Sequence, residues 1–202
     1  PRPIISDTAI SILRPATTEK LVVIDPGHGG ADLGAERGST YEKNLNLDIC
    51  LRLNKLLEEK GIKTYMIRED DRYVGVAERA FIANKLNASL FLSVHNNSMT
   101  SKSFRGTMTL CYSSGSQSHK IAKIVQRELI ESLGTRDCGI SIRPELGVLR
   151  RTTMPAVLAE VAFLSNDSDL ANLKTEAFRQ KAAEGLSEAV IEALISIVNQ
   201  VI

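Results

Sequence analysis

Short apolar runs alternate with longer amphipathic segments along most of this chain. An apolar residue at every third or fourth position predicts a helix, and a compact or alternating apolar run predicts a strand. The predicted strands are residues 21–25, 62–67, 89–94, 106–112, 139–143 and 156–161, and the predicted helices are residues 41–60, 75–87, 116–133, 168–174 and 175–199. This alternation predicts an α/β fold: a mixed, mostly parallel twisted sheet of about six strands with helices on both faces.

The alternation begins only after residue 20. Residues 1–20 carry three prolines and no helical period, so they are predicted as an N-terminal lead-in with one edge strand near residues 10–13. No internal repeat or domain-splitting linker is visible after residue 20, and the length suits one core. We therefore expect a lead-in, 1–20, followed by a single domain, 21–202.

Composition and charge narrow the classes of function. The 202 residues are 43% hydrophobic and 24% charged, as in an ordinary soluble globular protein, and the net charge is +1. Such a charge gives no strong attraction to nucleic acid, and a chain without tryptophan and with 4% aromatic residues offers few platforms for stacking bases. No apolar stretch approaches the roughly 20 residues that cross a bilayer. We expect neither a nucleic-acid partner nor a transmembrane segment.

The three cysteines do not indicate a metal site or a disulfide framework. Cys50, Cys111 and Cys138 are far apart, odd in number and form no C-x-x-C pair. The first two fall within predicted elements and are expected to be buried, whereas Cys138 falls in a predicted turn and is expected to be more exposed.

One histidine stands in a glycine-rich turn directly after the first buried strand. The turn and the strand end, residues 24–30, read Ile-Asp-Pro-Gly-His-Gly-Gly, and their proline and glycines disfavour both helix and strand. A second histidine, His95, follows another buried strand, residues 89–94. Because the carboxyl ends of parallel strands meet at one edge of a sheet, where ligands bind in open α/β folds, we expect His28 and His95 to lie at that edge.

Two glutamates are placed so that they can join these histidines. Glu42 stands at the start of a predicted helix, where the helix dipole also favours a carboxylate, and Glu160 lies in an otherwise apolar strand. Two histidines and one glutamate make a three-ligand zinc site with an open fourth position, and a second glutamate can take a proton from the activated water. The alternatives are a dipole-stabilised charge for Glu42 and a satisfied salt bridge for Glu160.

Other polar residues near the predicted strand ends have simpler explanations. Asp25 is expected to bind amides of the turn rather than to orient a ligand. Arg68 is expected to pair with Glu69 or Asp70 rather than with a substrate carboxylate.

The third histidine, His119, lies on the polar start of a helix and is predicted to be solvated. For Asn96 and Asn97 a loop-capping role and a contact with substrate are equally open.

Several separate motifs, in order along the chain, resemble those of one family. From about residue 21 to about residue 197 the chain resembles the zinc-dependent N-acetylmuramoyl-L-alanine amidases of bacterial cell walls, the amidase_3 type. The matching segments are Asp25-Pro26-Gly27-His28-Gly29-Gly30 with Asp32 and Gly34-Ala35, Glu42-Lys43, Asn46-Leu47, Arg79, Ala83-Asn84, Ser93-Val94-His95-Asn96-Asn97, Val148-Leu149-Arg150, Met154-Pro155-Ala156-Val157-Leu158-Ala159-Glu160 and Phe163-Leu164-Ser165-Asn166.

The resemblance implies the roles of the site residues. It implies that His28, Glu42 and His95 ligate one Zn²⁺ and that Glu160 is the catalytic carboxylate. It also implies a peptidoglycan hydrolase that cleaves the amide bond between N-acetylmuramic acid and L-alanine of the stem peptide. Such an enzyme is expected to be exported to the bacterial cell envelope, to be a monomer and to be open to control by a regulatory protein partner.

This chain departs from the family's usual pattern at a few positions. Ile67, Asn96 and Ala162 stand where the family often has threonine, alanine and glycine, and none of these changes removes a ligand or the base. Some members carry a helical insert after the second histidine that covers the metal. The stretch between Asn96 and Gly106 is too short for one, so we expect an open groove.

Two other functions are compatible with the same residues. One is a weakly active or partner-regulated wall-binding domain, and the other is a zinc peptidase that cuts within the stem peptide. The chain begins at Pro1 without a signal-peptide pattern, so we expect a fragment or a processed chain.

Overall fold

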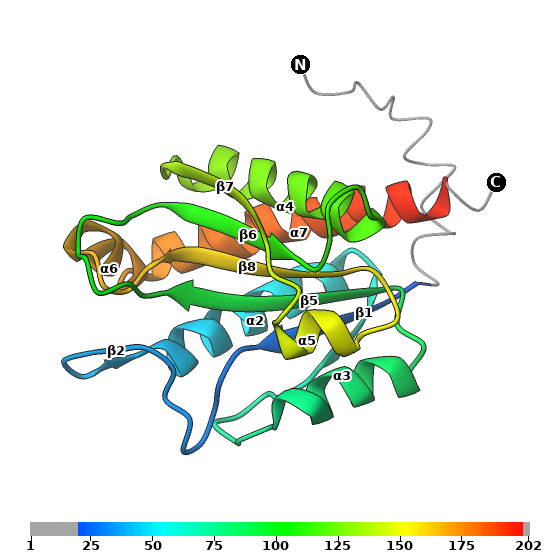
Figure 1. The fold of residues 1–202 in the computed structure, drawn as a ribbon, viewed down its shortest axis with the longest axis horizontal. Helices are drawn as coiled ribbons and strands as arrows, with labels where there is room; N and C mark the ends of the chain where they lie inside the picture. The colour runs from blue at the N-terminus through cyan, green and yellow to red at the C-terminus, as the bar shows by residue number, and fades with distance from the viewer. Residues whose placement is uncertain (1–19, 200–202) are drawn as a thin grey trace.

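The computed structural model describes residues 20–199, and in this range six strands form one twisted sheet between two layers of helices (Figure 1). The strand order is β4-β1-β5-β8-β6-β7. The strands are β1 (Leu21–Pro26), β4 (Lys63–Met66), β5 (Leu90–Asn97), β6 (Thr107–Cys111), β7 (Asp137–Ile142) and β8 (Ala156–Phe163).

The sheet is mixed, with one antiparallel pair. β1 runs parallel to β4 and to β5, β5 runs parallel to β8, and β6 runs parallel to β7. Within this six-stranded sheet, only β6 and β8 pair antiparallel. The mixed, mostly parallel sheet of about six strands expected from the sequence is thus confirmed.

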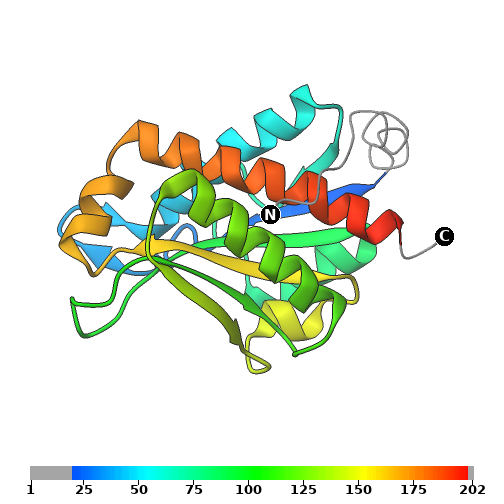
Figure 2. The same ribbon diagram turned by 90° about the horizontal axis from the view of Figure 1, so that it is seen from above.

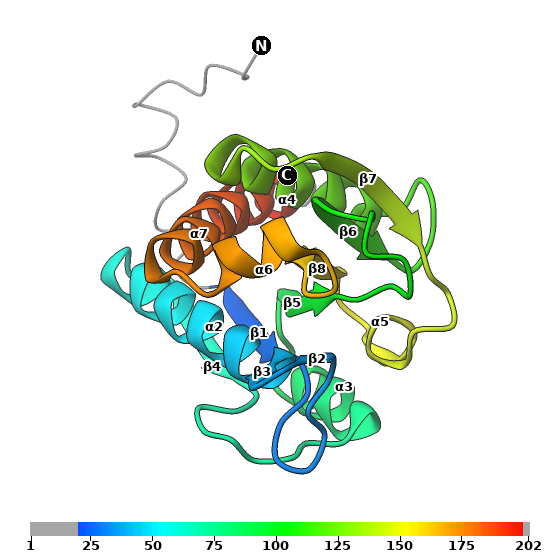
Figure 3. The same ribbon diagram turned by 90° about the vertical axis from the view of Figure 1, so that its left-hand side faces the viewer.

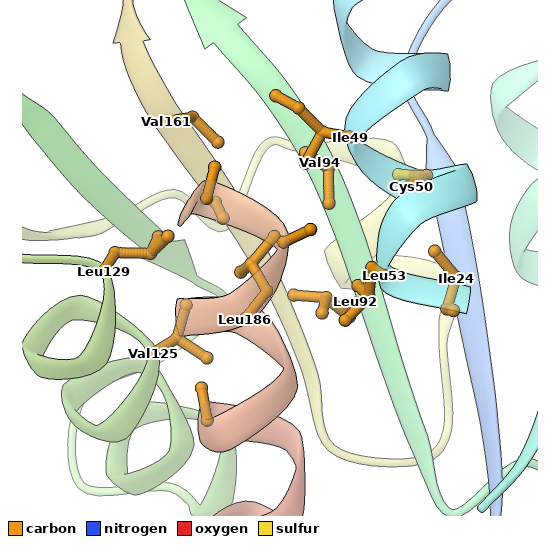
Figure 4. Packing of buried hydrophobic residues seen from close by; sticks show 14 of the residues in the cluster. Ile24, Ile49, Cys50, Leu53, Leu92, Val94, Val125, Leu129, Val161 and Leu186 are labelled. Carbon is orange, nitrogen blue, oxygen red and sulfur yellow. The ribbon is translucent and has the colours of Figure 1, made fainter. Parts of the chain in front are cut away.

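Three long helices cover one face of the sheet (Figures 2 and 3). They are α2 (Glu42–Glu59), α4 (Gln117–Leu133) and α7 (Glu176–Val198), and the short α6 (Asp167–Leu173) precedes the last of them. Figure 4 shows their apolar side chains packed against the strands: Ile49 and Leu53 from α2, Val125 and Leu129 from α4, and Leu186 from α7 meet Ile24, Leu92, Val94 and Val161. This core is larger than the one on the opposite face of the sheet, because three long helices each bury an apolar face against the strands.

Two shorter helices cover the opposite face only in part. They are α3 (Val76–Lys85) and α5 (Gly147–Arg151), which lie together on the far side of the sheet from α7 in Figure 3. Their buried residues form a separate, smaller core with Val23, Phe91 and Leu158. The carboxyl ends of β1, β5 and β8 extend beyond this cover, so polar side chains on this face can meet a ligand there.

Capping residues explain where several helices begin and end. The Ser116 hydroxyl accepts a hydrogen bond from the His119 amide at the start of α4, and Gly134 ends that helix in the left-handed conformation with φ 64°. The Thr175 hydroxyl accepts from the Phe178 amide at the start of α7. These are the side chains and the glycine that the sequence places at the predicted boundaries.

Between residues 20 and 199 every predicted helix and strand is present, with bounds that differ by at most three residues. The largest shift is in β5, which continues through Asn97 instead of ending at residue 94, so His95 lies within a strand. Three elements of the described range were not predicted, namely β2 (Glu36–Arg37), β3 (Thr40–Tyr41) and α5. The hairpin of β2 and β3 lies in a segment predicted as a polar loop, and α5 lies in a segment with no assigned element.

Parts of the N-terminal prediction lie outside the described residues. The lead-in and its edge strand near residues 10–13 fall there, except for residue 20. Within the described part of the chain, no helix combines the length and the apolar character that a membrane span requires.

Candidate metal centre

The strand pleat places four polar side chains on the face that carries α3 and α5. Asp25 on β1 is the register partner of Ser93 on β5, and His95, two residues further along β5, is the register partner of Glu160 on β8. Register partners share a face, and side chains alternate along a strand. The sequence prediction that two strand ends meet at one edge is therefore confirmed, and β8 adds Glu160 beside them.

The glycine turn after β1 presents His28 to this edge. His28 adopts a positive φ of 62°, which a non-glycine residue rarely does, and the turn is closed by two backbone hydrogen bonds between Gly29 and Asp32. Asp32 Oδ2 lies 3.0 Å from His28 Nδ1. The turn thus directs the opposite ring nitrogen, Nε2, toward the first residue of α2.

That first residue is Glu42, and both histidines converge on it. Glu42 Oε1 lies 3.2 Å from His28 Nε2 and 3.0 Å from His95 Nδ1. One ligand atom from each of the three residues lies within 4.8 Å of the others. The structure therefore brings together His28, Glu42 and His95, as expected from the sequence. Of these, His28 and His95 are 67 positions apart in the chain.

Electrostatic coupling within this trio shifts the pKa values of two members. Burial lowers the pKa of His28, but hydrogen bonds and charges from Glu42 and Asp32 outweigh it and raise the pKa to about 9. Burial would raise the pKa of Glu42, but hydrogen bonds and charges from both histidines hold it well below its ordinary range. Without a metal ion, Glu42 is thus a carboxylate that attracts positive charge to the point between the two imidazoles.

Two glycines leave room for the ligand side chains. A Cβ on Gly27 would lie 2.2 Å from the His95 ring, and a Cβ on Gly34 would lie 2.6 Å from both Glu42 Oε2 and the His28 ring. Neither position can carry a side chain while the trio keeps its place. The glycines of the motif are therefore required by the site's geometry as well as by the turn.

Hydrogen bonds from behind fix the Glu42 carboxylate. The Ala35 amide donates to Oε2 at 2.8 Å, and the Asn96 amide donates to Oε1 at 3.1 Å. The Asn46 side chain also donates to Oε1, at 3.2 Å, and accepts from the Asn96 side chain at 2.8 Å. For Asn96 this answers the question that the sequence left open, because its buried side chain binds Asn46 and its backbone supports a candidate ligand.

Asp25 does not bind turn amides as predicted. It forms a buried ion pair with Arg79 on α3 and accepts a hydrogen bond of 2.7 Å from the Ser93 hydroxyl. Arg79 also donates to the backbone carbonyls of Pro26 and His28, at 2.7 and 2.8 Å. A buried aspartate is more stable with a charged partner than with amides alone, and this pair ties the glycine turn to α3.

The prediction for Arg68 is also wrong, both as an ion pair with its neighbours and as a substrate contact. Its side chain is fully buried and donates to the carbonyls of Pro26, Gly27, Lys43 and Asp70 at 2.8–3.0 Å. The planar guanidinium can satisfy several carbonyls at once, which suits a point where three backbone segments meet. Arg68 therefore supports the turn below the site.

Glu160 has a buried carboxylate oxygen without a hydrogen-bond partner. Among the described residues, its Oε2 is one of two buried side-chain atoms in that condition. Burial raises the pKa of Glu160 to about 7, although the neighbouring charge on His95 opposes the shift. The predicted alternative of a satisfied salt bridge does not hold, and an unpaired carboxyl of this kind beside a candidate metal site is suited to proton transfer.

The remaining predicted positions lie away from this centre. His119 lies at the surface at the start of α4, where it is half-buried and its Nδ1 accepts a hydrogen bond from the Gly115 amide. Cys138 lies in β7, not in a turn, and is half-buried. Cys50 and Cys111 are buried as expected.

The donor set fits a zinc ion. Two imidazole nitrogens and one carboxylate oxygen are the ligands of three-residue catalytic zinc sites. The three donors already face a common point, the carboxylate is held by three donors from behind, and Gly27 and Gly34 leave space around the rings. No role was predicted for Asp32, although it stands in the motif that carries the family resemblance and four residues after His28.

Comparison with known proteins identifies the family of the chain. The family model described as N-acetylmuramoyl-L-alanine amidase (Amidase_3) matches residues 22–192. The N-acetylmuramoyl-L-alanine amidase LytC of Bacillus subtilis is 34% identical over 191 residues, which are 94% of this chain and 38% of LytC.

Two solved structures share the fold at similar identity. The catalytic domain of the amidase CwlV from Paenibacillus polymyxa superposes with a TM-score of 0.83 at 35% identity, over 87% of this chain and 98% of that domain. The CwlD amidase from Clostridioides difficile, solved in complex with the GerS lipoprotein, superposes with a TM-score of 0.84 at 29% identity, over 88% of this chain and 99% of that one. The chain belongs to the Amidase_3 family of N-acetylmuramoyl-L-alanine amidases.

Proposed function

We propose that this protein is a zinc-dependent peptidoglycan amidase that hydrolyses the bond between the lactyl group of N-acetylmuramic acid and L-alanine of the stem peptide. His28 Nε2, Glu42 Oε1 and His95 Nδ1 are the proposed ligands of one Zn²⁺. When bound there, zinc supplies a Lewis acid for the scissile carbonyl and lowers the pKa of a water molecule toward about 7.

The proposed general base is Glu160. Its carboxylate takes a proton from the attacking water and returns it to the nitrogen of L-alanine as the carbon–nitrogen bond breaks. The products are a free carboxyl group on the lactyl ether and a stem peptide with a free L-alanine amino group. Asp32 holds His28 in place, and Asn46 and Asn96 hold Glu42.

One observation carries this proposal. The buried Oε2 atom of Glu160 has no hydrogen-bond partner, and Glu160 is the strand neighbour of His95. A buried carboxyl that serves only the fold is paired, because an unpaired one costs several kcal/mol. An unpaired one beside a three-ligand cluster is suited to a reaction.

The test compares the wild-type protein with Glu160→Gln. We expect the wild type to bind about one zinc ion, to clear a suspension of purified peptidoglycan and to release stem peptides that begin with L-alanine. Glu160→Gln is expected to bind zinc equally and to lose clearing by at least about 10²-fold, because general-base catalysis contributes about 10²–10⁴-fold. Glu78→Gln, an exposed glutamate on α3, is the matched control and is expected to retain full activity.

The outcomes separate the alternatives. A Glu160→Gln protein that clears peptidoglycan as well as the wild type contradicts the assigned base. Fragments that begin with a residue other than L-alanine indicate a zinc peptidase that cuts within the stem peptide. A wild-type protein that binds zinc and clears nothing indicates a wall-binding or partner-regulated domain.

The site of action that we propose is the bacterial cell envelope, outside the cytoplasmic membrane, because peptidoglycan lies there. A relative from Staphylococcus aureus, 31% identical over 181 residues, is described as the probable cell wall amidase LytH. Control by a protein partner is compatible with the proposal, since the CwlD structure contains the GerS lipoprotein. Mixing the protein with candidate envelope lipoproteins and measuring clearing rates tests that part.

A further inference from the structure

A cavity of about 150 Å³ adjoins the candidate metal centre on the side of α3 and α5. His28 and His95 line one wall, so a carbonyl held at the metal centre lies at the cavity's mouth. The opposite walls come from the segment that leads into α3 and from the start of α5. Whatever occupies the cavity is therefore a group bonded close to the reacting carbon.

Much of the remaining lining is apolar. Val76 and Leu146 form the outer part, and Val148 and Leu158 form the inner part. Val148 and Leu158 are buried, whereas Val76 is 53% exposed at the rim. A cavity lined in this way favours a small alkyl group over a polar one.

The buried charged groups in the walls already have partners, because Asp25 and Arg79 are paired with each other. A polar ligand group that used either of them would compete with this ion pair, whereas an alkyl group leaves it intact.

The cavity's width is set by close packing between its two outer walls. A Cβ on Gly147 would lie 2.6 Å from Val76 Cγ1, so α5 and α3 already approach as closely as glycine allows. The cavity is small, with a volume near 150 Å³, and has room for a methyl-bearing carbon with its neighbours.

We propose that this cavity is a subsite for the methyl group next to the scissile amide, and that it limits the size of the residue that the enzyme accepts there. The inference rests on the proposed function, because that substrate carries a methyl group on each side of the bond: the lactyl methyl and the L-alanine side chain. Both are small alkyl groups close to the scissile carbonyl, so the cavity suits either of them. The experiment below decides which of the two methyl groups enters it.

The first arm of the test uses synthetic substrates. N-acetylmuramoyl tetrapeptide is compared with an analogue that lacks the lactyl methyl and with one that has glycine in place of L-alanine. One of the two analogues is expected to lose about 10-fold or more in kcat/KM, as expected for a missing methyl in an apolar pocket. That analogue identifies which methyl enters the cavity.

The second arm uses variants of the rim. Val76→Phe fills the outer part of the cavity and is expected to lower kcat/KM for the parent substrate at least 10-fold with zinc content unchanged. Ala77→Phe adds the same ring at a neighbouring exposed position that does not line the cavity and is the matched control. Leu146→Ala enlarges the cavity and is expected to improve cleavage of a substrate in which the identified methyl is replaced by ethyl.

The outcomes are distinct for the two proposals. If both analogues are cleaved like the parent and Val76→Phe has no effect, the subsite is overturned while the amidase function stands. If the wild type cleaves neither the parent substrate nor purified peptidoglycan, the proposed function fails and the subsite fails with it.

Discussion

The carboxylate of Asp32 lies 3.0 Å from Nδ1 of His28, and this contact determines which ring nitrogen faces Glu42. With Nδ1–H donated to the aspartate, the lone pair of Nε2 points to the place where Glu42 and His95 converge. The glycine turn brings the two residues together, because its backbone hydrogen bonds join Gly29 and Asp32.

Removing this support is expected to weaken metal binding. Asp32→Ala should lower zinc affinity by about 10–100-fold, the usual effect of losing a carboxylate behind a ligating histidine. Competition with a zinc chelator measures it. Glu69→Ala removes an exposed carboxylate on a nearby loop and serves as the control. Equal affinities for Asp32→Ala and the wild type would show that the contact does not orient His28.

Gly34 leaves space for the candidate ligands, and Gly38, which has a similar backbone conformation, provides a control for testing this role. Gly34 has φ 67° and no room for a Cβ, because Glu42 Oε2 and the His28 ring would lie 2.6 Å away. Gly38 has φ 60° and nothing within 4 Å of a Cβ. Each alanine substitution costs about 1–2 kcal/mol in backbone strain. Only Gly34→Ala should lose zinc binding, which is measured as zinc content after purification. If Gly38→Ala loses zinc as well, backbone strain and not the lack of space explains the loss.

Zinc binding is expected to release a proton at neutral pH. Hydrogen bonds and charges from Glu42 and Asp32 outweigh burial and raise the pKa of His28 to about 9 in the metal-free protein, so His28 is protonated at pH 7.5 and must lose that proton to ligate zinc. Calorimetry in buffers of different ionisation enthalpy should report about one proton per zinc ion. Glu160→Gln removes the neighbouring carboxyl, whose pKa burial raises to about 7. No proton release from that variant would contradict the assignment.

The same shift has a consequence for the stability of the metal-free protein. The folded pKa of His28, about 9, exceeds its ordinary value of 6.5, so the folded state binds the proton more tightly. The stabilisation of the folded state by protonated His28 is fully present below pH 6.5 and is lost as the pH rises through 9. Urea unfolding in the presence of a chelator should therefore show wild-type stability falling from pH 6.5 to 9, and His28→Ala should remove most of that fall.

The ion pair of Asp25 and Arg79 is expected to matter for folding more than any surface pair. Both side chains are buried, and Arg79 holds the turn through the carbonyls of Pro26 and His28. Asp25→Ala leaves the guanidinium buried without its counter-charge and should lower the free energy of unfolding by about 3–5 kcal/mol. Lys55→Ala, which breaks an exposed pair with Glu59, should cost less than about 1 kcal/mol. Similar losses for the two would contradict this ranking.

The sequence predicted the fold because its signals are local and repeated. Leu45, Ile49 and Leu53 recur at helical spacing, and all three are buried on one face of α2. The hairpin β2–β3 and the short α5 carry only a few residues each, so periodicity has too little length to show them.

For the site, residue type and position relative to predicted strands were enough to select His28, Glu42, His95 and Glu160 as candidates. The resemblance to known amidases then supplied the expected division between ligands and base. Local spacing gave no guide to the Asp25–Arg79 ion pair or to the bonds of Arg68 to Pro26 and Lys43, because these partners lie 25 or more positions away. Their partners follow from the packing of α2, α3 and β1, which no short-range pattern encodes.

The sequence by itself determined the α/β class, the order of strands and helices, the glycine turn and the chemical types available for a metal site, because these depend on periodicity and on the intrinsic properties of residues. Only the tertiary structure decided that the strand pairing puts His95 beside Glu160, that Glu42 meets both histidines, and that α3 and α5 enclose an apolar cavity beside them. The reason is physical: distances between residues far apart in sequence are set by sheet order and helix packing, which are cooperative outcomes of burying the whole core.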